Sequence, residues 1–247
     1  MEQSILAINH LHLKLIIEIL FGIIVLQEFR NGYFAAFPSF FRSFPWRSYR
    51  NACFWVLVLI PLLYLDPMLL GTIQSFDSPS AEKVLNFGRM MGRNLWWYLM
   101  GLYLTAYLSG KRKIREIFLG ALLGAGLAGA IGFLFKFIFL RARPFNNLGH
   151  FSFFNIEGLT EDLNKFQSFP SGDVVIVAGT VSYLFFKSRK GYGRWLLFLL
   201  PFSTALSRVM LNRHWPSDTV AAVLIALFVG HFFSRYDAFK NTGEVIR

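Results

Sequence analysis

The chain has 247 residues, of which 55% are hydrophobic and 18% aromatic, while only 16% are charged. A water-soluble domain carries about a quarter charged residues, so this composition excludes a disordered chain and argues against a soluble enzyme. The 25 Lys and Arg outnumber the 14 Asp and Glu, and the net charge is +11. Because the basic residues form short clusters between apolar runs, they are typical of membrane-protein loops rather than of a nucleic-acid-binding surface.

Six apolar runs predict an all-α, polytopic membrane protein with a bundle of six transmembrane helices, since a span needs about 20 mostly apolar residues. The runs are Ala52–Leu70, Asn94–Leu108, Ile117–Leu140, Val174–Phe186, Trp195–Leu206 and Val220–Phe233. Small residues recur four apart between Gly120 and Gly132, a spacing that indicates close helix packing.

The N-terminal residues 1–51 are expected to form a separate helical element that lies in the membrane interface, before a six-helix domain of residues 52–247. Ser4–Leu26 has no cleavage signal. It carries a narrow polar stripe, and the stretch that follows mixes aromatic residues with arginines. A seventh span over Leu11–Leu26 is the alternative.

The distribution of Lys and Arg predicts the orientation. Counted along the chain, one alternate set of connecting segments carries about twice as many Lys and Arg as the other. The richer set is expected to be cytoplasmic. Segments 71–93, 141–169 and 207–218 then share the outer face, and the first two are long enough to form a lid over a head group.

Three polar segments on this face carry candidate chemistry. Lys136 and Arg143 are seven residues apart, so they would share a helical face, up to Pro144, and could bind a phosphate. Ser171, Gly172 and Asp173 open the run at 174, where backbone N–H groups favour an anion. Both segments also have a plainer interpretation. Lys136 would be a lysine that reaches the membrane interface, and Ser171 or Asp173 would be a simple helix cap.

The third segment holds Arg208, His214 and Asp218, which offer an anion clamp, a nucleophile or base, and a carboxylate to orient the imidazole. A solvated loop histidine is the plainer interpretation. Arg141 and Arg213 border this predicted pocket, and the sequence does not choose between phosphate and sugar contacts for them. His150 lies in the outer loop, where a solvated histidine is favoured over a head-group contact.

The three segments read K-x6-R-P, P-S-G-x and S-R-x5-H-x3-D, and in this order they resemble the motifs of the type 2 phosphatidic acid phosphatase superfamily. The resemblance covers residues 52–233. It implies that His214 forms a phosphohistidine and that Asp218 holds its ring. It further implies phosphate binding by Lys136, Arg143, Ser171, Gly172 and Arg208.

Asp173 departs from the superfamily, which usually has a histidine there as the acid for the leaving oxygen. Three interpretations stay open. Asp173 is the acid, or the substrate is a lipid pyrophosphate or sugar phosphate that needs less acid, or the chain has weakened activity. Neither a nucleotide loop nor the carboxylate pair of a two-metal site is present, and the lone Cys53 excludes a cysteine cluster. We therefore expect no metal and no cofactor.

The sequence thus predicts a lipid phosphatase of a bacterial-type inner membrane, with its site facing the periplasm. Its expected partners are the bilayer and a membrane lipid phosphate or pyrophosphate, such as lipid A, undecaprenyl pyrophosphate or phosphatidylglycerol phosphate, and not nucleic acid. In size and N-terminal character the chain looks most like the bacterial lipid A phosphatases, although no motif separates these from their relatives. A lipid-to-lipid phosphotransferase and a non-catalytic lipid-phosphate binder are the alternatives, and the oligomeric state stays open.

Overall fold

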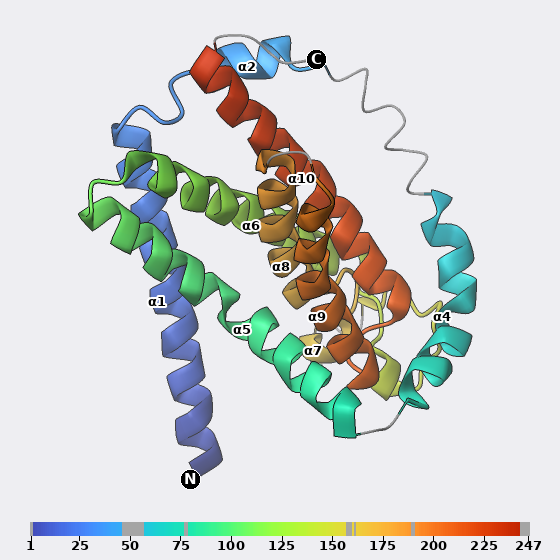
Figure 1. The fold of residues 1–247 in the computed structure, drawn as a ribbon. Coiled ribbons are helices and arrows are strands. Elements are labelled where there is room, and N and C mark those ends of the chain that lie inside the picture. The colour runs from blue at the N-terminus through green and yellow to red at the C-terminus, as the bar shows by residue number, and fades with distance from the viewer. Residues whose placement is uncertain are drawn as a thin grey trace. The chain divides into compact units, whose positions relative to one another are not determined.

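The structure is a computed structural model that describes residues 2–45, 57–76, 79–156, 160, 162–188 and 191–242. Helices joined by turns and loops account for these residues, with no strand among them, so the all-α prediction is confirmed for this part of the chain (Figure 1). The chain divides into two compact units, Met1–Phe44 with Ala238–Arg247, and Pro45–Asp237. Every residue that we predict for the site belongs to the second unit.

The first unit contains α1 (Glu2–Arg30), α2 (Phe37–Ser43) and the end of α10. Its core is aromatic: Phe40 is fully buried, with ring centroids 5.2 Å from Phe44 and 5.5 Å from Phe239. Lys240 lies over the ring of Tyr33. The helical character of the N-terminal region agrees with the expectation, whereas its place in the membrane interface and its boundary at residue 51 remain predictions.

The second unit is built around a helix that is buried on nearly all sides. Its longer helices are α4 (Leu59–Gln74), α5 (Pro79–Leu108), α6 (Arg112–Phe139), α8 (Gly172–Lys187), α9 (Leu199–Met210) and most of α10 (Pro216–Thr242). The valines and alanines of α8 are almost inaccessible to solvent. Helix α8 packs against α6, α9 and α5, and α5 packs along α9 and α6, so the start of α8 lies where several helices meet (Figure 1).

Glycines allow the closest of these helix contacts. A Cβ atom added at Gly124 would lie 3.0 Å from the carbonyl oxygen of Gly179, and one added at Gly120 would overlap the ring of Tyr183. The small residues of α6 therefore let its backbone approach α8, as in other membrane helix pairs. The predicted close packing is confirmed at these two positions.

The expectation of an outer loop over residues 71–93 is wrong. Helix α4 continues to Gln74, and α5 is a single helix of 30 residues that begins at Pro79. Proline is well suited to the first helical turn, and the residues that follow include Ala, Glu, Lys, Leu and Arg, all good helix formers. The polar stretch before Asn94 is therefore the first half of α5, and it forms no lid.

Two other predicted elements end differently in the structure. Helix α6 stops at Phe139, because Leu140 adopts a left-handed conformation with φ of 36°, so Lys136 and Arg143 do not share a helical face. The run Trp195–Leu206 divides into a 3-10 helix, η4 (Tyr192–Phe198), and α9. The segment 141–169 contains a short turn, η2 (Pro144–Asn146), and α7 (Leu163–Phe166).

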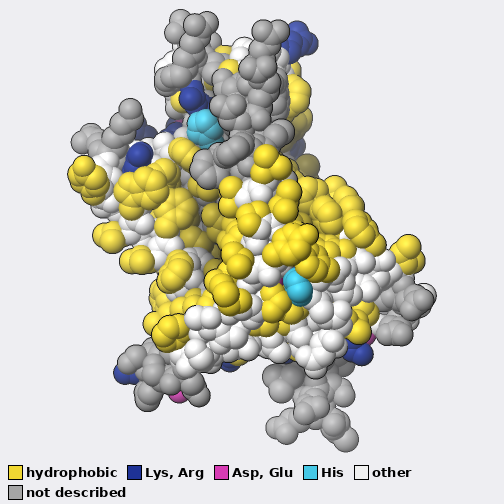
Figure 2. Space-filling view, turned by 90° about the vertical axis from the view of Figure 1, so that its right-hand side faces the viewer, with side chains coloured by type: hydrophobic (Ala, Val, Ile, Leu, Met, Phe, Trp, Pro, Cys, Tyr) yellow, Lys and Arg dark blue, Asp and Glu magenta, His cyan; other side chains and the backbone are white. Residues whose placement is uncertain are grey.

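Two segments of the described chain are long and apolar enough to cross a membrane: Arg112–Asn146, with mean hydropathy 2.2, and Pro216–Thr242, with 1.6. Helix α4 is apolar but shorter, and residues 52–56 of the first predicted span lie outside the described residues. The six-span bundle therefore remains a prediction. Large hydrophobic side chains are exposed on α4, α5 and α6, and Figure 2 shows one face on which such side chains gather broadly.

Candidate active site

A pocket of about 490 Å³ lies among the first half of α5, the end of α6, the start of α8 and the end of α9. Six cations and one carboxylate contribute to its wall. The lining residues are Arg89, Arg93, Lys136, Arg143, Arg208, Arg213, Asp173, Gly172, Leu211 and His214. So many like charges around one space are stabilised by a multiply charged anion.

Backbone hydrogen bonds join the three sequence motifs behind this pocket. The N–H of Ser171 donates to the carbonyl of Asp218 at 3.1 Å, and the N–H of Ser168 donates to the carbonyl of Arg141 at 3.1 Å. The N–H of Arg143 donates to the carbonyl of Lys165 at 2.9 Å, although Arg143 follows the end of α6. The loops, and not a continuous helix, therefore place the motif side chains together.

His214 lies in the loop between α9 and α10, and its side chain is buried except where it faces the pocket. Its Nδ1 lies 2.8 Å from the carbonyl oxygen of Ser168. A carbonyl can only accept a hydrogen bond, so Nδ1 carries the proton and Nε2 carries the lone pair. Burial lowers the pKa of His214 to about 4, and the positive charges of Arg143 and Lys136 act in the same direction. The carboxylate of Asp218 raises the pKa, but by less. The imidazole is then neutral at pH 7 and can act as a nucleophile.

This lowered pKa gives a direct prediction. In a titration of histidine-labelled protein followed by NMR, the signal that disappears in His214→Gln should titrate near pH 4, whereas an exposed histidine titrates near 6.5. Above pH 4 the ring is neutral, so the nucleophilic form persists through the neutral range. Addition of inorganic phosphate should move the midpoint upward, because a nearby anion favours the imidazolium. A midpoint at or above 6.5 in the unliganded protein would contradict this assignment.

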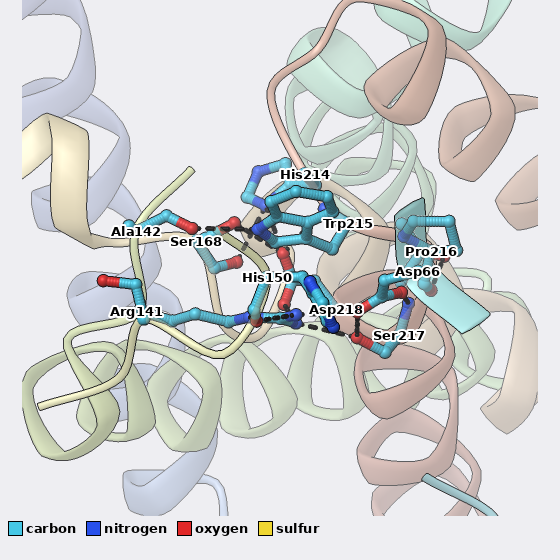
Figure 3. Close-up of polar contacts among 12 residues, drawn as sticks. Asp66, Arg141, Ala142, His150, Ser168, His214, Trp215, Pro216, Ser217 and Asp218 are labelled. Atoms are coloured by element: carbon cyan, nitrogen blue, oxygen red, sulfur yellow. Dashed lines mark hydrogen bonds and ion pairs between the residues drawn. The ribbon is translucent and has the colours of Figure 1, made fainter. Parts of the chain in front are cut away.

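Behind His214, a buried polar network fixes the carboxylate of Asp218 (Figure 3). Asp218 accepts hydrogen bonds from Nη1 of Arg141 at 2.6 Å, from the hydroxyl of Ser168 at 2.5 Å and from the N–H of Trp215 at 2.8 Å. Its Oδ2 lies 3.7 Å from Nδ1 of His214, beyond hydrogen-bond distance. The direct partner of the ring is therefore the Ser168 carbonyl, and Asp218 acts on the ring as a nearby charge.

Arg141 joins this network to α4. Its Nη2 donates to Oδ2 of Asp66 at 2.6 Å and to the carbonyl of His150 at 2.7 Å. The side chains of Asp66, Arg141 and Asp218 are all fully buried. Asp66 also accepts from the N–H of Ser217 at 2.8 Å and from its hydroxyl at 2.5 Å. One guanidinium thus links two carboxylates, which is the kind of fork geometry that Arg provides and Lys does not.

Several donors that line the pocket or lie directly behind its wall are buried without a hydrogen-bond partner in the described part of the chain. They include Nε of Arg143, Nε of Arg208 and the hydroxyl of Ser171. Buried polar groups are nearly always satisfied in folded proteins. Donors left open beside a cationic pocket are what a bound phosphate would engage.

Asp173 occupies the first turn of α8 and forms an ion pair with Arg208, with 2.5 Å between Oδ2 and Nη2. Its side chain is about one-third exposed. Helix α5 passes close beside it, because Gly92 has no side chain: a Cβ there would lie 3.0 Å from the Cβ of Asp173. Asp173 is therefore neither a helix cap nor a solvated surface residue, and its carboxylate lies in the anion pocket.

Six of the eight predicted site residues line the pocket, namely Lys136, Arg143, Gly172, Asp173, Arg208 and His214. The other two stand behind it. Ser171 is the N-cap residue of α8, although its side chain makes no capping hydrogen bond, and Asp218 supports the His214 loop. The sequence did not assign a role to Arg213 or Arg141. In the structure Arg213 lines the pocket, and Arg141 is part of the buried network. The functional roles of all these residues remain predictions.

Sequence reasoning missed Arg89, Arg93, Asp66 and Ser168. The two arginines are one helical turn apart, and their spacing would have been informative if residues 79–93 had been recognised as a helix. Asp66 is an ionisable residue within an apolar run, which is by itself a signal of function in a membrane protein. Ser168 contributes largely through its backbone carbonyl, and since every residue has one, the sequence does not reveal this contact.

The chain is similar to known proteins over much of its length. The model of the PAP2 superfamily matches residues 117–241. The undecaprenyl-diphosphatase of Sulfolobus acidocaldarius is 26% identical to this chain over 191 residues, which cover 73% of this chain and 89% of that protein. Among solved structures, that of Aquifex aeolicus LpxE is similar with a TM-score of 0.47 and 23% identity, covering 67% of this chain and 92% of that one.

The described helices surround a pocket lined by six cations, which suits a multiply charged anion. The superfamily match spans half of the chain, so the protein belongs to the PAP2 superfamily. It is an enzyme of the lipid phosphatase type. The resemblance that the three motifs suggested is therefore confirmed.

Proposed function

We propose that the protein removes phosphate from a membrane lipid phosphate or diphosphate through a phosphohistidine at His214, without a metal ion. The observation that carries the proposal is that His214 lines a pocket with six cations while its Nδ1 is held 2.8 Å from the Ser168 carbonyl, which leaves Nε2 as the nucleophilic nitrogen. Phosphoryl transfer spreads negative charge over three oxygens, so positive groups positioned in advance stabilise its transition state.

In this proposal Nε2 of His214 attacks phosphorus, and the P–O bond to the lipid breaks. Nδ1–H stays hydrogen-bonded to the Ser168 carbonyl, and the charge of Asp218 stabilises the positive ring that forms. Lys136, Arg143 and Arg208 hold the phosphoryl oxygens, together with Ser171 and the backbone of Gly172 at the start of α8. Water then attacks the phosphohistidine, which releases inorganic phosphate and restores the ring.

A lipid substrate is supported by the two segments that are long and apolar enough to cross a membrane and by the similarity to an undecaprenyl-diphosphatase. The excess of Lys and Arg on alternate connecting segments favours a pocket on the outer, periplasmic face of a bacterial-type inner membrane. Replacement of His150 by Cys in a Cys53→Ser background tests this orientation. A reagent that cannot cross the membrane should label the new cysteine in intact cells, and protection of that cysteine would reverse the orientation.

The phosphoenzyme itself provides the test of the mechanism. Detergent-purified protein, kept in EDTA, should take up label from a ³²P-labelled lipid phosphate or diphosphate panel when it is quenched within the first turnover. The label should be stable to alkali and labile to acid, as phosphohistidine is, and should map to the peptide that contains His214. Phosphate release without such a label, or release that EDTA abolishes, would overturn the mechanism. Label that passes to a second lipid and not to water would indicate a phosphotransferase.

A further inference from the structure

The pocket holds more positive charge than one phosphoryl group requires. Lys136, Arg143 and Arg208 belong to the three motifs, and they account for the binding of the group that is transferred. Three further arginines line the same pocket and belong to none of the motif positions: Arg89, Arg93 and Arg213. Cations that gather in one space repel one another unless an anion lies between them, so these arginines point to a second anionic group on the substrate.

Two of the extra arginines come from one helix face. Arg89 and Arg93 are four residues apart on α5, and residues at this spacing are neighbours on a helix. The glycine before each of them brings α5 close to α8 and α9. A Cβ added at Gly88 would lie 2.2 Å from the carbonyl oxygen of Ser203, and one at Gly92 would lie 3.0 Å from the Cβ of Asp173. The pair is therefore held on the side of the pocket where Asp173 lies.

Asp173 stands where the superfamily usually has the histidine that gives a proton to the leaving oxygen. Its carboxylate is instead paired with the guanidinium of Arg208, with 2.5 Å between Oδ2 and Nη2. A leaving alkoxide needs such a proton, whereas a leaving phosphate can depart as an anion if cations receive its charge.

We propose that Arg89 and Arg93, with Arg213, form a second phosphate subsite that holds the leaving phosphate of a lipid diphosphate and takes over the role of a general acid. This inference rests on the proposed function, because it assumes that His214 transfers the terminal phosphoryl group. If the subsite exists, the enzyme prefers a phosphoanhydride substrate to a phosphate monoester.

The step balances without any further reagent. The Nε2 lone pair of His214 forms a bond to the terminal phosphorus, and the bond between that phosphorus and the bridging oxygen breaks. The bridging oxygen keeps the electron pair, and the lipid monophosphate leaves as an anion against the arginines. Water then attacks the phosphohistidine, the P–N bond electrons return to Nε2, and the water proton leaves with the inorganic phosphate or enters the solvent.

The test compares farnesyl diphosphate with farnesyl monophosphate, which share one lipid chain, in detergent-purified protein. We expect kcat/KM to be at least about 100-fold higher for the diphosphate, because one charge-assisted contact contributes roughly 10-fold or more. In the double variant Arg89→Gln/Arg93→Gln, the loss of kcat/KM should be at least about tenfold greater for the diphosphate than for the monophosphate. Asp173→His supplies an acid, so it should raise turnover of the monophosphate. The ratio of kcat/KM for the diphosphate to that for the monophosphate should then fall.

Lys83→Gln is the matched control, because Lys83 lies on the exposed surface of the same helix and outside the pocket. It should leave both substrates unchanged. Equal losses for the two substrates in the double variant, or no loss for either, would overturn the subsite while leaving the phosphohistidine mechanism in place. Absence of phosphate release and of a labelled His214 with both substrates would instead contradict the proposed function itself.

Discussion

His214→Gln should lower the rate of phosphate release by at least about 10⁴-fold, because removal of a catalytic nucleophile has effects of this size or larger. Glutamine cannot form a phosphohistidine, and no second histidine lines the pocket in the described part of the chain. The cations remain in place, so the variant should still bind lipid diphosphate. Phosphate release measured beside an equilibrium binding assay separates the two effects.

His231→Gln is the control for this prediction. His231 lies on α10 outside the pocket, where its ring packs against Phe186 at a centroid distance of 4.7 Å. Its replacement should leave phosphate release within about threefold of the original protein, as expected for a change away from the reacting atoms. Comparable activity in His214→Gln would mean that another group attacks phosphorus. Loss of binding together with turnover would mean that the variant had lost its fold.

Arg141→Met should produce the largest loss of stability, about 3–5 kcal/mol, because it leaves two buried carboxylates without their cation. Asp66 and Asp218 are both fully buried and both bond this one guanidinium. For a chain of this size the thermal midpoint should fall by roughly 10 °C. Unfolding of detergent-solubilised protein, followed by circular dichroism, measures this shift.

Arg112→Met provides the comparison, since it makes the same substitution at a solvent-exposed ion pair. The Arg112 side chain is 79% exposed and meets Glu116 within one helical turn, a kind of pair that contributes at most about 1 kcal/mol. Its thermal midpoint should therefore change by only a degree or two. Equal shifts in the two variants would show that the buried network contributes no more to stability than a surface pair.

The parts of the site that could be predicted are those that local sequence controls. Ser171, Gly172 and Asp173 open an apolar run, so a helix start with exposed N–H groups follows from their order. His214 precedes Pro216, which begins α10, so its place in a loop also follows. In both cases the residues that decide the structure are neighbours in the chain.

The parts that could not be predicted depend on distant contacts. Pro144 predicts a helix end a few residues later, yet α6 already ends at Phe139, and the Leu140 carbonyl accepts a hydrogen bond from Nδ2 of Asn155 at 2.8 Å. Asp66 meets Arg141 across 75 positions of sequence. Residues 79–93 were misjudged for a different reason: their polarity suggested a loop, whereas their helix propensity and the close contacts of Gly88 and Gly92 make them helical.

The hydrogen bond between His214 and the Ser168 carbonyl has a consequence for mutational mapping of this enzyme. In the proposed mechanism the group that orients the nucleophile is a main-chain carbonyl, and every amino acid placed at position 168 retains it. Substitution of Ser168 removes only the hydroxyl that contacts Asp218. A library of all single substitutions will therefore rank position 168 below its mechanistic importance. Replacement of a backbone amide, and not of a side chain, is the chemical change that would expose it.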